Sequence, residues 1–77
     1  MTNKLERVLT RTTEERLRTQ DWSLSASYSD SRVFTKDIGG ATCVLTMAND
    51  GVYVIMAVDI TEEQQKLISE EVKQLNV

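Results

Sequence analysis

The side chains that could carry chemistry in this chain are carboxylates, one thiol and a set of lysines and arginines. The 77 residues include no histidine and a single cysteine, Cys43. Without histidine, neither a serine–histidine nor a cysteine–histidine nucleophile can be assembled. One thiolate cannot by itself build a zinc or iron–sulfur site within a chain. We therefore expect no metal site and no cofactor.

Three acidic residues, Asp59, Glu62 and Glu63, lie close together in the sequence. They lack the spacing of an EF-hand loop, and the two glutamates suit the positive end of a helix that begins at Thr61. A pair of carboxylates can perform acid–base catalysis, but a domain of this size leaves little volume for a substrate cleft. We expect a protein that has no catalytic residues and is not an enzyme.

Cys43 lies within an apolar stretch rich in β-branched residues. We expect it to be a small buried core residue rather than a reactive thiol. A lone thiol suits a reducing compartment. The N-terminus lacks the apolar segment of a secretory signal, and no apolar run approaches the roughly 18 residues of a membrane span. These features predict a cytoplasmic protein without a membrane partner.

Basic residues gather near the N-terminus, although the whole chain carries a formal net charge of −3. Four of them have the spacing of one helix face: Lys4, Arg7, Arg11 and Arg18. We expect this stripe to be a solvated face, with contact to an anionic partner such as nucleic acid as the alternative. The negative net charge argues against a dedicated nucleic-acid binder, which usually carries a basic surplus.

Two helices are expected to flank the chain. Leu5, Val8 and Leu9 lie at helical spacing, and we predict one helix from about residue 3 to residue 19. A second helix is predicted to begin at Thr61-Glu62-Glu63-Gln64, a capping box that precedes a wide apolar arc.

Between the helices, four segments have the pattern of strands: residues 22–28, 32–38, 41–48 and 52–58. A Gly-Gly pair joins the second strand to the third, and a turn that contains Gly51 joins the third to the fourth. The sequence therefore predicts a single α+β domain over residues 1–77. It has two layers: a four-stranded antiparallel meander sheet, with an N-terminal and a C-terminal helix in the order α-β-β-β-β-α.

The register of the last hairpin decides which side chains face the helices, because a slip of one residue turns every side chain to the other face. A two-residue Asp50-Gly51 loop would pair Met47 with Val54. A three-residue loop that includes Asn49 would slip the pairing. We prefer the two-residue loop because it places the large flexible apolar residues on one face.

In that register, the second face of the hairpin has no cover if both helices pack on the first. The residues predicted on it are Val44, Thr46, Tyr53, Ile55 and Ala57. An uncovered apolar patch is typical of an interaction site, and the uncharged edge strand 52–58 could pair with another chain. We expect a protein partner, or a second copy, to bind there. One helix on each face, which would leave nothing exposed, is the alternative.

Three charged residues occupy positions that this arrangement would bury: Arg16, Lys36 and Glu71. A buried charge without a partner is costly. We predict that Glu71 pairs with Arg16 or Lys36; the alternative is that both bases extend to water.

These expectations favour a non-catalytic regulatory or inhibitory protein that acts by protein–protein contact. Small accessory proteins that phages and mobile elements use to inhibit host defence systems have this character. The alternative is a homodimeric nucleic-acid-associated protein that uses the basic stripe of the first predicted helix.

Overall fold

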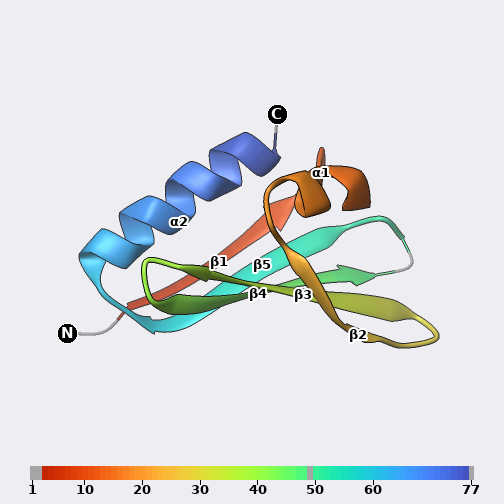
Figure 1. Ribbon diagram of the computed structural model, residues 1–77, viewed down its shortest axis with the longest axis horizontal. Coiled ribbons are helices and arrows are strands. Elements are labelled where there is room, and N and C mark those ends of the chain that lie inside the picture. Colours follow the sequence, from red (N-terminus) through yellow and green to blue (C-terminus); the bar gives the residue numbers. More distant parts are fainter. Residues whose placement is uncertain (1–2, 49, 77) are drawn as a thin grey trace.

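The computed structural model describes residues 3–48 and 50–76 (Figure 1). Its elements, in chain order, are β1 (Asn3–Leu9), α1 (Glu14–Thr19), β2 (Ser23–Ser27), β3 (Ser31–Ile38), β4 (Ala41–Ala48), β5 (Tyr53–Ile60) and α2 (Glu62–Leu75). The strands form one antiparallel sheet in the order β1-β5-β4-β3-β2. The predicted α+β class is confirmed, but the sheet has five strands where four were expected.

The segment predicted as one N-terminal helix, residues 3–19, contains a strand and a short helix instead. Leu5 and Leu9 are both fully buried. They face the core from β1 because alternate residues of a strand share a face, and their spacing of four fits a helix equally well. The ladder from Asn3 opposite Ile60 to Leu9 opposite Tyr53 pairs one side of the β1 backbone with β5. The strand β5, expected at the edge, therefore lies inside the sheet.

The short helix α1 ends in a Schellman motif that returns the chain to the sheet. Asp21 has a φ of 68°, Asp21 N donates to Arg18 O at 3.1 Å, and Trp22 N donates to Leu17 O at 2.9 Å. This is the paired hydrogen-bond pattern of the motif, with the left-handed residue just after the helix. Trp22 and Leu17 are both buried, so the hydrophobic contact that accompanies the motif also anchors α1 to the core.

The turn between β3 and β4 is the predicted Gly39-Gly40 turn, with Ile38 opposite Ala41. Both glycines have positive φ, at 60° and 87°. The positive φ favours glycine at Gly39, and a Cβ atom there would lie 2.6 Å from Leu67 Cδ1 and displace the end of that side chain.

The pairing of the first two predicted strands, residues 22–28 and 32–38, was expected to place Ala26 opposite Phe34, and this register is wrong. Phe34 lies opposite Leu24 rather than Ala26, and the register shifts between Leu24 and Ala26 through a bulge. As a result, Ala26 lies opposite Val33 and leaves the core face, on which the strict alternation of residues 22–28 placed it. Leu24 stays on the face of Phe34 but is 46% exposed on the edge strand, and Tyr28 is exposed beyond the end of β2.

The preferred register of the last hairpin is also wrong. Met47 lies opposite Tyr53 rather than Val54, which is a slip of one residue. Gly51 has a φ of 82°, and Ala48 N donates to Val52 O at 3.1 Å. This pairing agrees with the loop alternative that includes Asn49, a residue outside those described. The slip exchanges the two faces of β5.

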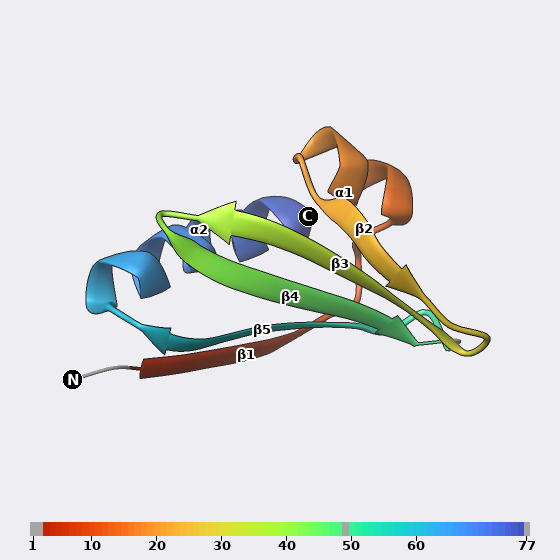
Figure 2. The same cartoon turned by 60° about the horizontal axis from the view of Figure 1, so that its bottom comes forward.

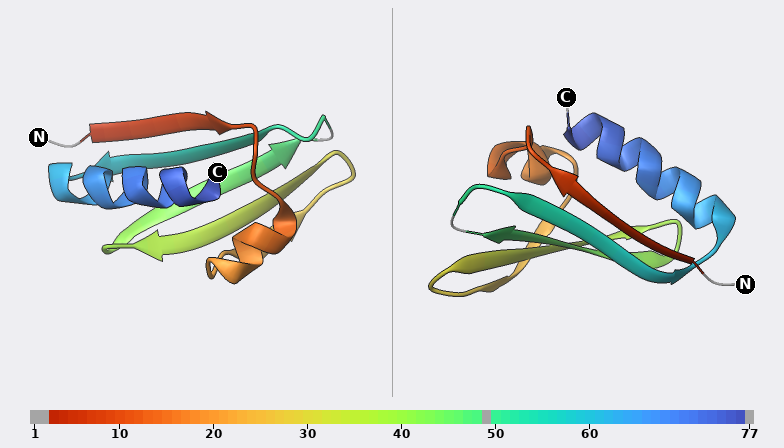
Figure 3. Two further views of the ribbon diagram at one scale, coloured as in Figure 1. Left: turned by 90° about the horizontal axis from the view of Figure 1, so that it is seen from above. Right: turned by 180° about the vertical axis from the view of Figure 1, so that it is seen from behind.

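Both helices pack on the same face of the sheet, as Figures 2 and 3 show. Their buried residues Leu17, Ile68 and Leu75 join the sheet residues in one core. The predicted capping box of α2 is confirmed: Gln64 N donates to Thr61 Oγ1 and Thr61 N donates to Gln64 Oε1. Across residues 3–48 and 50–76, no helix is long and apolar enough to cross a membrane.

An ion pair lies between α2 and the sheet. Lys36 Nζ is 2.7 Å from Glu71 Oε1, and the two side chains are 20% and 10% exposed. This confirms the predicted pairing of Glu71 with a base, and the partner is Lys36. Arg16 instead donates to the carbonyl oxygens of Arg11 and Leu75, so it links α1 to the end of α2.

Candidate interaction surface

The sheet face opposite the helices is the candidate site, and we call it the open face. Its central residues, read from the cross-strand pairs, are Val8, Val33, Thr35, Val44, Thr46, Val54 and Met56, with Val58 at one end. One row crosses the sheet from Val8 through Val54 and Thr46 to Val33. A second row crosses from Glu6 through Met56 and Val44 to Thr35. β-branched residues make up most of the two rows together, and such residues fit a pleated, half-buried surface.

Several apolar side chains on the open face remain accessible. Val8 is 58% exposed, Val58 is 55% exposed and Met56 is 38% exposed. The solvated face of an antiparallel sheet normally carries polar side chains opposite a buried apolar face. The open face departs from that pattern because its two central rows carry valine, methionine and threonine, with one charged residue, Glu6, at the β1 end.

The charges of the open face lie at its margins. Lys4 and Glu6 belong to β1, and Lys4 Nζ lies 3.6 Å from Glu6 Oε2. At the opposite side, Asp37 belongs to β3, where its Oδ1 accepts a hydrogen bond from Gly40 N at 2.9 Å. Charge is depleted from the centre of protein interfaces and tolerated at their rims, so this distribution has the form of an interface.

The two edges of the sheet are protected against strand pairing. β1 carries three charged residues, Lys4, Glu6 and Arg7, while β2 has five residues and a bulge. Charges, short strands and bulges are the common means by which edge strands avoid pairing with other chains. By contrast, the described residues at the centre of the open face, on β3, β4 and β5, are uncharged.

The five residues predicted to bind a partner separate onto two faces. Val44 and Thr46 lie on the open face and are half-buried. Tyr53, Ile55 and Ala57 lie beneath the helices, at 6%, 0% and 2% exposed, so their predicted place on an uncovered surface is wrong. The physical reason is the slipped register of β5, which turned these three side chains inward.

The residues that replace them on the open face come from the same strand and from β1. Met56 and Val54 were predicted on the core face, and Val8 was predicted on a helix. The three-residue loop alternative would have found Val54 and Met56. No local signal pointed to Val8, because its pairing partner Val54 is distant in the sequence.

The predicted basic stripe is not a helix face. Lys4 and Arg7 belong to β1, Arg11 lies between β1 and α1, and Arg18 belongs to α1. Strand geometry turns neighbouring side chains to opposite sides, so the spacing that aligned these residues on a helix does not align them here. Lys4 pairs with Glu6, and Arg7 Nη1 donates to Glu6 O at 2.8 Å.

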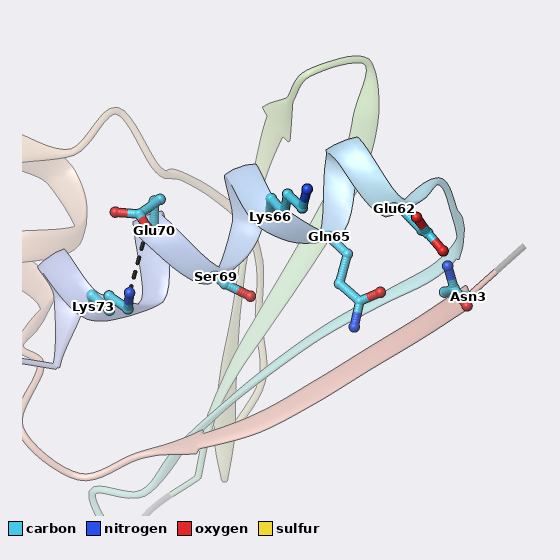
Figure 4. Close-up of a pocket in the computed structure, with 7 residues that line it drawn as sticks. All are labelled: Asn3, Glu62, Gln65, Lys66, Ser69, Glu70 and Lys73. Atoms are coloured by element: carbon cyan, nitrogen blue, oxygen red, sulfur yellow. Dashed lines mark hydrogen bonds and ion pairs between the residues drawn. The ribbon is translucent and has the colours of Figure 1, made fainter.

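Two shallow grooves lie away from the open face. One, of about 490 Å³, runs between α2 and β1, and its lining is polar: Asn3, Glu62, Gln65, Lys66, Ser69, Glu70 and Lys73 (Figure 4). The other, of about 510 Å³, lies near the β2–β3 turn, where Arg32 pairs with Glu14 beside Tyr28 and Tyr53. In the first groove the acids and bases alternate along the helix, and Lys73 Nζ lies 3.4 Å from Glu70 Oε1.

Cys43 lies in the core and is fully buried. Burial raises the pKa of its thiol to about 11, and the nearby carboxylates of Asp37 and Glu71 add to the rise. The thiol is therefore protonated at neutral pH and has little nucleophilic character. Among the residues described, no three histidine, cysteine, aspartate or glutamate side chains are grouped so that they could hold a metal ion.

The apolar surface of the open face is therefore not accounted for by the packing of this chain on itself. Its apolar rows contribute nothing to the core that the helices cover. No protein-family model, curated protein or solved structure matches this chain.

Proposed function

We propose that this protein is a non-catalytic regulatory or inhibitory protein that acts by protein–protein contact through the open face. The observation that supports the proposal is the pair of apolar rows on a sheet face that carries no helix, with charge only at its margins. The partner surface that suits such a face is of the same kind: flat, apolar at its centre, and polar at its rim.

The energetics of the exposed residues indicate how much of the face a partner must cover. Burying the remaining surface of Val8, Met56 and Val58 would contribute about 1 kcal/mol each. Association costs at least about 4 kcal/mol in lost translational and rotational freedom. These three residues are therefore not sufficient alone, and the partner must also cover the half-buried residues of both rows. A sheet or another flat surface can do this, whereas a single helix would cover only a strip.

The proposal is tested by placing a charge at the centre of the open face. Met56→Glu introduces a carboxylate between Val44 and Glu6, its cross-strand neighbours, at a position that is 38% exposed, so the monomer should stay folded. Leu67→Glu is the matched control, because Leu67 is 50% exposed on α2, on the other side of the sheet. Circular dichroism and thermal melting establish that both variants fold.

The measurement is quantitative capture of binding partners, second copies included, from the cells in which the protein naturally acts. We expect a partner that the wild type and Leu67→Glu retain equally and that Met56→Glu loses by at least about tenfold, equivalent to 1.4 kcal/mol. Equal retention of every captured protein by all three chains would refute the proposal.

A further inference from the structure

We infer that the partner of the open face is a second copy of this chain, packed sheet against sheet about a two-fold axis that runs along β4. This inference rests on the proposed function, since it names the occupant of the same surface. It follows from the size of the face, from the distribution of charge along its margins and from the protection of its edges.

The size of the open face is close to the minimum that a stable interface needs. β3, β4 and β5 each have eight residues, which corresponds to about 26 Å of strand. The five strands span about 20 Å, so the face covers roughly 500 Å² before the relief of its side chains is counted. Specific interfaces bury about 600 to 1,000 Å² per partner. A partner must therefore cover the whole face, and an identical face matches it in length and width.

The symmetry follows from the strand order. A two-fold axis along β4 places β4 over β4 of the second copy, β5 over β3, and β1 over β2. Val44 and Thr46 then meet the same residues of the second copy near the axis, and Val54 meets Val33. Valine thus lies over valine and threonine over threonine across the centre, and the inner faces of a sandwich pack in this way about 10 Å apart.

Charge complementarity selects this axis over the other axis in the plane of the sheet. With the axis along β4, Lys4 on β1 lies over β2 of the second copy, at the same end of the face as Asp37 on the neighbouring strand β3. Each dimer then brings two such pairs of opposite charge together. An axis across the strands would instead place β1 over β1 and bring Asp37 over Ser31, without a base to pair with.

In a competing arrangement, two sheets would join side by side through their edge strands. The charges of β1 and the bulge of β2 oppose it. Pairing β1 with β1 would bring Lys4, Glu6 and Arg7 of both copies together along one short ladder, and β2 is interrupted by its bulge. The helices lie on the far side of each sheet, so face-to-face packing leaves them outside, as the outer layers of a four-layer assembly.

The first measurement is the solution mass of the full chain by sedimentation equilibrium over a range of concentrations. We expect a dimer, of twice the 8.7 kDa of the monomer, for the wild type and for Leu67→Glu. Met56→Glu should raise the dissociation constant by at least about tenfold. A wild type that stays monomeric up to about 1 mM would overturn the inference. Capture of a different protein that still depends on Met56 would then leave the proposed function standing.

The second measurement tests the axis by exchange of charge. Lys4→Glu should weaken the dimer several-fold, since it places two carboxylates near each other on both sides of the axis. The double variant Lys4→Glu with Asp37→Lys should recover most of the lost affinity. Because Asp37→Lys removes the acceptor of the hydrogen bond from Gly40 N, thermal melting checks that this variant is still folded. Failure to recover, with both variants folded, would refute the axis along β4. A dimer that Met56→Glu leaves intact would overturn both the inference and the proposed function.

Discussion

Removal of Lys36 alone should destabilise this fold much more than removal of Lys36 and Glu71 together. The Lys36 ammonium lies 2.7 Å from Glu71 Oε1 beneath α2. The second carboxylate oxygen, Oε2, is buried and accepts no hydrogen bond from the residues described. Lys36→Met keeps the length of the side chain but leaves the Glu71 carboxylate with no partner for either oxygen, in a site where the side chain is only 10% exposed.

The expected magnitude follows from the burial of the two partners. Removing one member of a buried ion pair typically costs 3–5 kcal/mol, and we take about 3 kcal/mol because the Lys36 side chain keeps 20% of its exposure. A domain of this size has a total stability of roughly 4–11 kcal/mol. The loss should therefore lower the melting temperature by about 12 to 24 °C. The double variant, Lys36→Met with Glu71→Leu, should lie within about 1 kcal/mol of the wild type or above it, because apolar replacements avoid the desolvation cost.

The assay is a double-mutant cycle measured by urea denaturation. The coupling between Lys36 and Glu71 should be about 2–3 kcal/mol. A matched control is the pair Lys73 and Glu70 on the same helix, whose side chains are 75% and 67% exposed at 3.4 Å. Its coupling should stay below about 0.5 kcal/mol. If the effects of the two buried substitutions were additive within about 0.5 kcal/mol, the ion pair would not hold α2 to the sheet.

Two further predictions concern single residues. Asp21 has a φ of 68°, so Asp21→Gly should stabilise the Schellman motif by about 1 kcal/mol in urea denaturation, and a loss of stability would contradict the assignment. Cys43, whose thiol has a pKa of about 11, should react with iodoacetamide at pH 8 only through unfolding. Because the unfolded thiol ionises near pH 9 and the folded thiol near 11, the free energy of unfolding should fall as the pH rises between these values. Cys43→Ala should lack that part of the decline, and an identical pH profile for the two chains would refute the raised pKa.

Much of the fold could be predicted from local signals. The Gly39-Gly40 turn fixed the pairing of β3 with β4, and the Thr61–Gln64 capping box fixed the start of α2. The strand β1 could not be predicted in this way. Its leucines fit a helix and a strand equally well, and the partner that decides between them, β5, begins more than forty residues after β1 ends.

Only part of the candidate site was predicted, because the register of each strand depends on the turn that precedes it. Val44 and Thr46 were placed correctly because the glycine turn before them sets the register of β4. Tyr53, Ile55 and Ala57 depended on the loop after β4, where one additional loop residue exchanges the faces. The sequence favours a hairpin at this position, but it does not choose between the two loop lengths, since Asp50-Gly51 is compatible with both.

The unexpected strand β1 changes how this protein can meet another chain. Had β5 been the edge, an uncharged strand would have been open to pairing, and a partner could have joined the sheet through backbone hydrogen bonds. β1 covers that edge and presents Lys4, Glu6 and Arg7 in its place. At the same time it adds Val8 to the open face and extends the apolar row by one strand. The same seven residues therefore disfavour contact through the edge and favour contact through the face, which is why we argue for side-chain packing between sheets rather than for strand addition.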